Sequence, residues 1–171
     1  MPLIVRGKQG YVMVVLLIAV VILGVFLMMA RPLWQTELQR DLEEEYLFRA
    51  RSIAQGIERY VKKHNNLFPQ SLKVLAEEKM VRRLYTDPLT EHGRWYVVMQ
   101  QRGPAASGYL LVEEEMAPRY IANAVIVGVC STSEQKSFRE YRGRTIYNEW
   151  AVVIGEKEDQ PLPQLDYPAR K

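Results

Sequence analysis

Three titratable side chains, Asp87, Glu91 and His92, fall within six residues, close enough to suggest a metal or acid–base site. Their spacing matches no usual ligand pattern for zinc or calcium. The Asp87–Pro88 pair more simply predicts a turn. The run Ser131-Thr132-Ser133 has no histidine nearby in sequence, and the chain carries no nucleophile motif. These residues therefore predict a protein that is not an enzyme, with no metal site and no cofactor.

The single cysteine, Cys130, ends an apolar run over residues 124–130. Such a run predicts a buried strand, with the thiol packed as a small hydrophobe rather than a reactive group. One cysteine also excludes an internal disulfide and a cysteine-based zinc site. We likewise expect Trp95 and Trp150 in the core of a sheet.

The longest apolar segment, residues 11–30, contains 20 residues and no charge. As a helix it would span about 30 Å, the thickness of a bilayer core. It is too long for the apolar region of a secretory signal, and Arg31-Pro32-Leu33-Trp34 follows in place of a small-residue cleavage site. The segment therefore predicts a single membrane-spanning helix.

Charge around this segment predicts its orientation. Arg6 and Lys8 precede it, which favours a cytoplasmic N-terminus, although Arg31 at the far end weakens the asymmetry. Trp34 is suited to the membrane interface. Arg6, Lys8 and Arg31 hold three of the 23 cations, which leaves 20 cations against 20 acids in residues 33–171. This neutral outer part predicts no nucleic-acid partner.

The elements beyond the membrane predict an α+β fold. A helix over about residues 12–63, kinked at Pro32 and ending at His64-Asn65-Asn66, carries an apolar stripe at three- and four-residue steps. The stripe is formed by Tyr46, Ala50, Ile53, Ala54, Ile57, Tyr60 and Val61. It needs a partner to bury it, and we expect a small antiparallel sheet.

Shorter patterns supply the rest of that domain. Residues 71–78 predict a short helix with Ser71 as N-cap. Apolar runs predict strands at 94–99, 109–112, 124–130 and 148–154, the first two forming a hairpin. The proline-containing tail from residue 155 predicts a loose segment. The acidic runs 43–45 and 113–115 predict solvated faces, with subunit docking as the alternative.

With these elements in place, the chain resembles bacterial pseudopilins of type II secretion systems and other type IV pilin-like proteins. A short basic leader ends at Gly10, and the apolar run begins at Tyr11. Gly24 and Pro32 stand fourteenth and twenty-second after the leader, where pilins commonly carry glycine and proline. Segments 44–49, 68–72, 84–88 and 147–150 also resemble this group, so that the likeness spans most of residues 10–154.

The resemblance implies a pilin-like fold with five parts and a filament function. They are a leader (1–10), a transmembrane and assembly helix (11–30), the outer half of the long helix (31–66), a globular α/β domain (67–154) and a loose tail (155–171). Prepilin peptidase would cut after Gly10 and methylate Tyr11. The subunit would then lie in the bacterial inner membrane, with its C-terminal domain in the periplasm.

The same resemblance implies partners and a mechanical role. Other pseudopilins would form the filament, and an inner-membrane platform with its ATPase would extract the subunits for protein export. Small residues such as Gly24 would support helix packing. Some relatives bind calcium near the C-terminus, but Glu156, Glu158, Asp159 and Asp166 lack that pattern, so we expect no metal there.

One position departs from the family. Pilins usually carry glutamate fifth in the mature chain, where it pairs with a neighbour's terminal amine, and here that position is Val15. The chain would then be a minor or tip subunit, or belong to a group that assembles without this pair. Two alternatives stay open beside the pseudopilus: a type IV pilus minor pilin, and an anchored periplasmic binding or sensor protein whose leader is retained.

Overall fold

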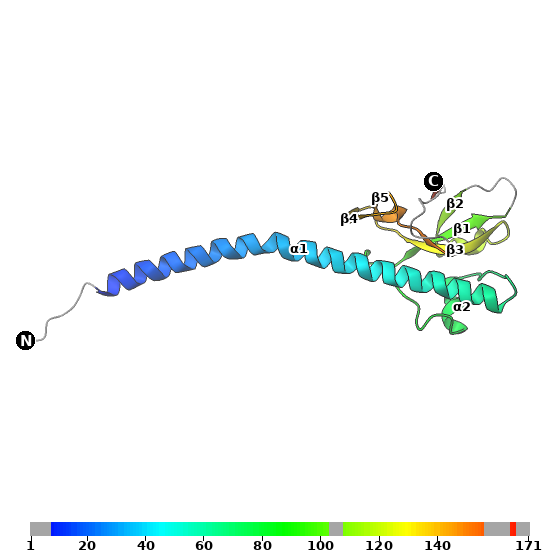
Figure 1. Cartoon of the computed structure of the whole chain (residues 1–171), viewed down its shortest axis with the longest axis horizontal. Helices are drawn as coiled ribbons and strands as arrows, with labels where there is room; N and C mark the ends of the chain where they lie inside the picture. The colour runs from blue at the N-terminus through cyan, green and yellow to red at the C-terminus, as the bar shows by residue number, and fades with distance from the viewer. Residues whose placement is uncertain (1–7, 103–107, 156–164, 167–171) are drawn as a thin grey trace, which may run out of the picture. The chain divides into compact units, whose positions relative to one another are not determined.

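The computed structural model describes residues 8–102, 108–155 and 165–166 (Figure 1). For residues 8–9 and 29–36 it describes the backbone alone. The chain divides into two compact units, Met1–Gln39 and Arg40–Lys171. It belongs to the α+β class, with an N-terminal apolar helix followed by a short helix and a mixed, curled sheet.

Helix α1 extends over Lys8–Lys63, four residues further toward the N-terminus than predicted, and includes Pro32. Its predicted end is confirmed. Asn65 and Asn66 take left-handed φ angles of 53° and 67°, and the Asn66 N–H donates to the Val61 carbonyl at 2.9 Å. Asparagine tolerates this conformation better than most residues, which explains why the helix stops here.

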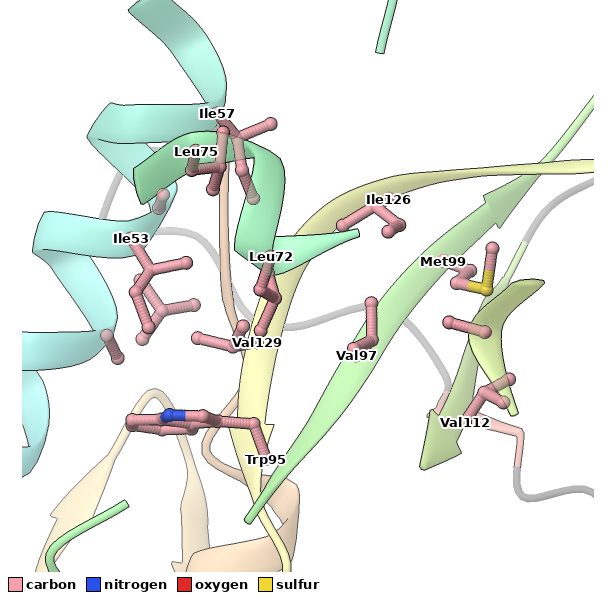
Figure 2. Close-up of a cluster of buried hydrophobic side chains, with 14 of the residues drawn as sticks. Ile53, Ile57, Leu72, Leu75, Trp95, Val97, Met99, Val112, Ile126 and Val129 are labelled. Atoms are coloured by element: carbon pink, nitrogen blue, oxygen red, sulfur yellow. The ribbon is translucent and has the colours of Figure 1, made fainter. Parts of the chain in front are cut away.

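The predicted stripe on the second half of α1 is buried. Tyr46, Ala50, Ile53 and Ile57 are each 1% exposed or less. They pack with Leu72 and Leu75 of α2 (Leu72–Glu77) and with the inner face of the sheet (Figure 2). Burial of each large aliphatic side chain contributes roughly 1.5–3 kcal/mol, so this stripe holds the domain together.

Ser71 stands at the predicted N-cap position of α2 in an extended conformation, but its side chain makes no capping hydrogen bond. The helix is therefore held by the burial of Leu72 and Leu75 rather than by its cap.

The main sheet has the strand order β6-β3-β1-β2-β7. Its strands are β1 (Trp95–Gln101), β2 (Tyr109–Glu113), β3 (Ala124–Ser131), β6 (Val152–Val153) and β7 (Leu165–Asp166). The predicted hairpin is confirmed, since β1 and β2 pair antiparallel. The expectation of a wholly antiparallel sheet is wrong, because β7 pairs parallel to β2.

The strand predicted over 148–154 is corrected as well. A 3-10 turn, η2 (Tyr147–Glu149), occupies its first part, and only β6 pairs with β3. Sequence patterns also missed a separate two-stranded ribbon of β4 (Lys136–Tyr141) and β5 (Arg144–Ile146), and a 3-10 turn η1 (Ala117–Arg119). Within the predicted loose tail, Leu165 and Asp166 belong to the sheet.

Both faces of the sheet are buried. Val97 and Met99 face α1, whereas Val98 on the same strand packs with Leu111 and Cys130 on the opposite face. A register shift between Val98 and Met99 curls β1 against β3. Irregularities of this kind bend the strand and increase its local twist.

Tyr46 joins the helix to Ser131 at the end of β3 and to Trp150, which follows the turn η2. Its hydroxyl donates to the Trp150 carbonyl at 2.6 Å and accepts the Ser131 N–H at 3.2 Å. Burial raises the pKa of this phenol well above its ordinary value, so it stays neutral.

We expect Tyr46→Phe to lower the free energy of unfolding by about 2–4 kcal/mol, because both backbone partners become buried and unpaired. Urea unfolding followed by tryptophan fluorescence measures the change. Tyr120→Phe is the matched control, since Tyr120 is 37% exposed. Equal stability of the two variants would show that the Tyr46 hydroxyl bonds contribute nothing.

Candidate functional site

The first candidate site is the apolar half of α1, Gly10–Met28. These 19 residues form a helix long and apolar enough to cross a membrane, and none of them is buried in the structure. Tyr11 is 72% exposed and Val15 45%. A soluble core helix would have its apolar surface covered by protein, so this exposure favours a membrane or another helix as the covering partner.

The residues predicted for processing and assembly all lie on α1: Gly10, Tyr11, Val15, Gly24 and Pro32. A Cβ atom added at Gly10 or Gly24 would meet nothing within 4 Å. Packing within the described chain therefore does not require glycine at either position. Their proposed roles must depend on other molecules, and these roles stay predictions.

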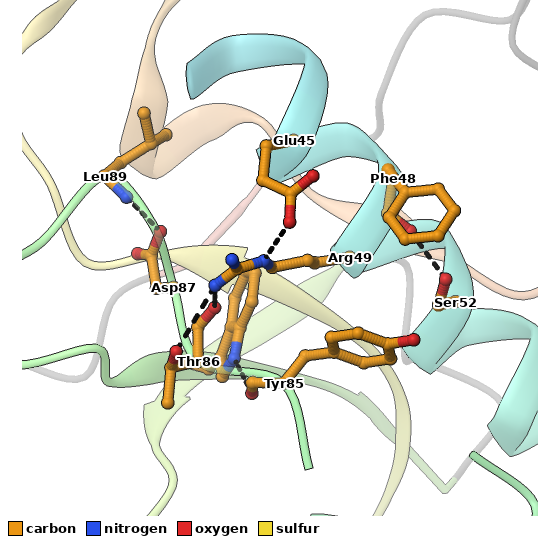
Figure 3. A network of polar contacts seen from close by, with 9 residues as sticks. Glu45, Phe48, Arg49, Ser52, Tyr85, Thr86, Asp87 and Leu89 are labelled. Atoms are coloured by element: carbon orange, nitrogen blue, oxygen red, sulfur yellow. Dashed lines mark hydrogen bonds and ion pairs between the residues drawn. The ribbon is translucent and has the colours of Figure 1, made fainter. Parts of the chain in front are cut away.

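A polar clamp ties the outer half of α1 to the loop before β1 (Figure 3). The Arg49 Nε donates to Glu45 Oε1 at 2.7 Å, and its Nη1 donates to the Thr86 carbonyl at 2.9 Å. Phe48 meets Tyr85 edge-on at 6.3 Å between ring centroids. The clamp fixes the segment that carries Asp87.

Asp87 is buried, and both of its carboxylate oxygens accept hydrogen bonds within the domain. Its Oδ2 accepts the Ser131 hydroxyl at 2.6 Å, and its Oδ1 accepts the Leu89 N–H at 2.9 Å, which forms the predicted turn. Desolvation raises the pKa of this carboxyl, against the opposing effect of these hydrogen bonds. Glu91 and His92 are exposed, and no cluster of metal-binding side chains occurs among the described residues.

The raised pKa of Asp87 predicts a pH effect on stability. Folding favours its protonated form, so its contribution is fully present below the ordinary aspartate pKa and is lost as pH rises through the folded-state pKa. We therefore compare the unfolding free energies of the wild type and of the Asp87→Asn variant. The excess stability of the wild type over the variant should be largest in acid and should fall toward neutral pH. Urea unfolding of both proteins across this range measures it. A difference that grows with pH would contradict the assignment.

Sequence reasoning missed a buried acid, Glu43, which is 1% exposed. Its Oε1 accepts the Tyr147 hydroxyl and the Phe138 N–H, both at 2.7 Å, and so attaches the β4–β5 ribbon to α1. A signal was present, because Glu43 precedes Tyr46 by three residues and Ala50 by seven, which places it on the buried stripe. The expectation that all of 43–45 is solvated is therefore wrong at Glu43.

Other singled-out residues lie in the core. Cys130 is buried and its thiol donates to the Asn148 carbonyl at 3.0 Å. Desolvation raises the pKa of this thiol strongly, which makes it unreactive as predicted. Trp95 and Trp150 are 2% and 1% exposed, which confirms their core role.

Of the four acids considered for calcium binding, the structure describes only Asp166. Glu156, Glu158 and Asp159 lie outside the described residues, and Asp166 is exposed on β7.

Comparisons of this chain with known protein families, with characterised proteins and with solved structures gave no match.

Proposed function

We propose that this chain is a pilin-like structural subunit of a type II secretion pseudopilus, held in the bacterial inner membrane and assembled into a filament for protein export. The observation that carries this proposal is helix α1 itself. Its first half is exposed at every position of 10–28, where all residues except Gly10 and Gly24 carry apolar side chains, and its second half is the central element of a folded domain. One continuous helix thus serves two different surroundings.

The chemistry of such a helix suits transfer between a bilayer and a filament. Apolar side chains that leave lipid for other apolar side chains lose little free energy, so subunits can be extracted and inserted without unfolding. Small residues, such as Ala19 and Gly24, allow neighbouring backbones to approach closely. The Val15 position offers no carboxylate, so assembly here would rest on packing.

The outer domain contributes shape and contacts rather than catalysis. Its buried polar residues, Glu43, Tyr46 and Asp87, bond to backbone and hydroxyl groups within the domain. This use of buried polar groups is typical of a rigid scaffold. It supports a domain that transmits force to its neighbours, with a membrane platform and its ATPase supplying the work.

A charge placed in the apolar helix tests the proposal. Val20 is 59% exposed, and arginine there costs roughly 2.5–3.5 kcal/mol at the centre of a membrane helix. We expect Val20→Arg to lower the amount of this chain in the sheared and sedimented filament fraction by more than about tenfold. Val20→Leu should leave that amount at the wild-type level. Immunoblots of the sheared fraction measure it. Equal incorporation of both variants would contradict a role for this helix in assembly.

A further inference from the structure

The outer domain carries a strongly basic surface where α1 ends. This basic end consists of six cations, Arg59, Lys62, Lys63, Lys79, Arg82 and Arg83, against the carboxylates Glu58, Glu77 and Glu78. The last turns of α1 contact the end of α2 and the loop after it. Arg59 Nη1 donates to the Met80 carbonyl at 3.4 Å, and Lys63 pairs with Glu78 at 2.9 Å. Glu58 forms an ion pair with Lys62 at 2.6 Å.

Three of these cations project from the loop after α2. Lys79, Arg82 and Arg83 are all exposed, and Leu84 beside them is 39% exposed. Arg83 lies over the Tyr85 ring at 5.4 Å. Arg82 forms no ion pair with the residues that the structure describes. Arg82 is therefore available to a partner.

A second surface of the same domain has the opposite character. A pocket of about 230 Å³ lies where β1 begins and β2 ends, with Trp95 and Tyr96 in its wall and Glu113, Glu114 and Glu115 around it. It is smaller than the roughly 300–1,000 Å³ of small-molecule sites, and its size suits one long side chain. We call it the acidic pocket.

Three carboxylates line this pocket together with one arginine, Arg94, and one histidine, His92. Arg94 reaches Glu115 at 3.4 Å, but both side chains are more than 60% exposed, so that pair is weak. Glu114 is half-buried, and desolvation raises the pKa of its carboxyl, with Lys73 opposing the shift. The attraction of an additional cation would offset both the desolvation of Glu114 and its repulsion by Glu115.

We propose that the basic end of one copy docks on the acidic pocket of a second copy, with the Arg82 guanidinium against Tyr96 and the surrounding carboxylates. Aromatic rings and carboxylates together are the surroundings that a guanidinium prefers. The two surfaces differ, so the contact is heterologous, and repeated contacts of this kind build a ring if the rotation closes and an open filament if it does not. This inference rests on the proposed function and assigns surfaces to it.

Disulfide trapping of the full chain in membranes tests the geometry. One variant carries Arg83→Cys and Glu115→Cys, and each single variant accompanies it. Cys130 does not interfere, since it is buried with an unreactive thiol. We expect oxidation to give a ladder of dimers, trimers and longer products from the double variant. A matched control replaces Glu115→Cys by Thr145→Cys, on an exposed residue of β5, and should give no ladder.

Charge reversal tests the chemistry in the same assay. Arg82→Glu in the double-cysteine chain should reduce the ladder about tenfold, because like charges then face each other. Adding Glu113→Arg should restore it, since the pair is regenerated with its signs exchanged. A ladder unaffected by either change would overturn the charge-based contact.

The remaining outcomes are equally decisive. Strong dimers from each single-cysteine variant would indicate a symmetric contact and overturn the proposal, as would an equal ladder from the Thr145→Cys control. No ladder from chains whose leader has been removed would overturn this contact while leaving filament assembly intact. A ladder from chains that retain the leader would support the contact and count against the processed-pilin function.

Discussion

Replacing Gly128 with alanine is expected to lower the free energy of unfolding by about 3 kcal/mol or more. A Cβ atom at this position of β3 would lie 2.1 Å from the Val152 carbonyl oxygen and 2.8 Å from the Val153 Cα. Both are backbone atoms of β6, so no side-chain rotation relieves the clash. The backbone of β3 or β6 must therefore shift, which disturbs the pairing of Gly128 and Val129 with Val152 and Val153.

Two further glycine-to-alanine variants, at Gly56 and Gly24, provide losses of unfolding free energy with which the loss at Gly128 is compared. At Gly56 the new Cβ would lie 2.5 Å from the Val81 Cγ1, and a side chain can move aside at lower cost. At Gly24 the new Cβ meets nothing within 4 Å, so the outer domain should keep its stability. Urea unfolding by tryptophan fluorescence should rank the losses as Gly128, then Gly56, then Gly24. A Gly128 variant as stable as the Gly24 variant would contradict the described pairing of β6.

Replacing Gly10 with alanine is expected to block maturation, leaving the ten-residue leader on the chain and Tyr11 without a methyl group. The structure makes this variant informative, because a Cβ at Gly10 has open space around it. Misfolding is therefore not a competing cause, and a block would report the requirement of the peptidase. Intact mass spectrometry of the membrane fraction measures the effect.

Gly24→Ala is the control for that experiment as well, since it makes the same chemical change fourteen residues further along. It should be processed like the wild type. Removal of the leader from the Gly10 variant at the wild-type rate would contradict the assignment of the cleavage position.

The parts of the fold that sequence predicts well are those whose burial leaves a regular pattern. The stripe from Tyr46 to Ile57 follows the helical period because one face of α1 is buried. The run 124–130 is almost wholly apolar because β3 is buried on both faces. The end of α1 was predicted from local chemistry, since Asn65 and Asn66 tolerate the left-handed conformation.

The missed parts depend on partners far away in the sequence. The ribbon strand β4 is largely exposed and charged, so it shows no alternation, and Glu43 holds it from 95 residues away. The edge strands β6 and β7 have two residues each, too few for any period. Asp87 suggested acid–base chemistry by its neighbours in sequence, whereas its burial and its bond to Ser131 depend on tertiary structure.

The central claim is that this chain is processed and then assembled, and the intact mass of the mature protein tests it most directly. The protein would be purified from membranes of a bacterium that has its own prepilin peptidase. We predict a chain that begins at Tyr11, lacks residues 1–10 and carries one added methyl group. A full-length, unmethylated chain would contradict the claim and indicate a protein permanently anchored through α1.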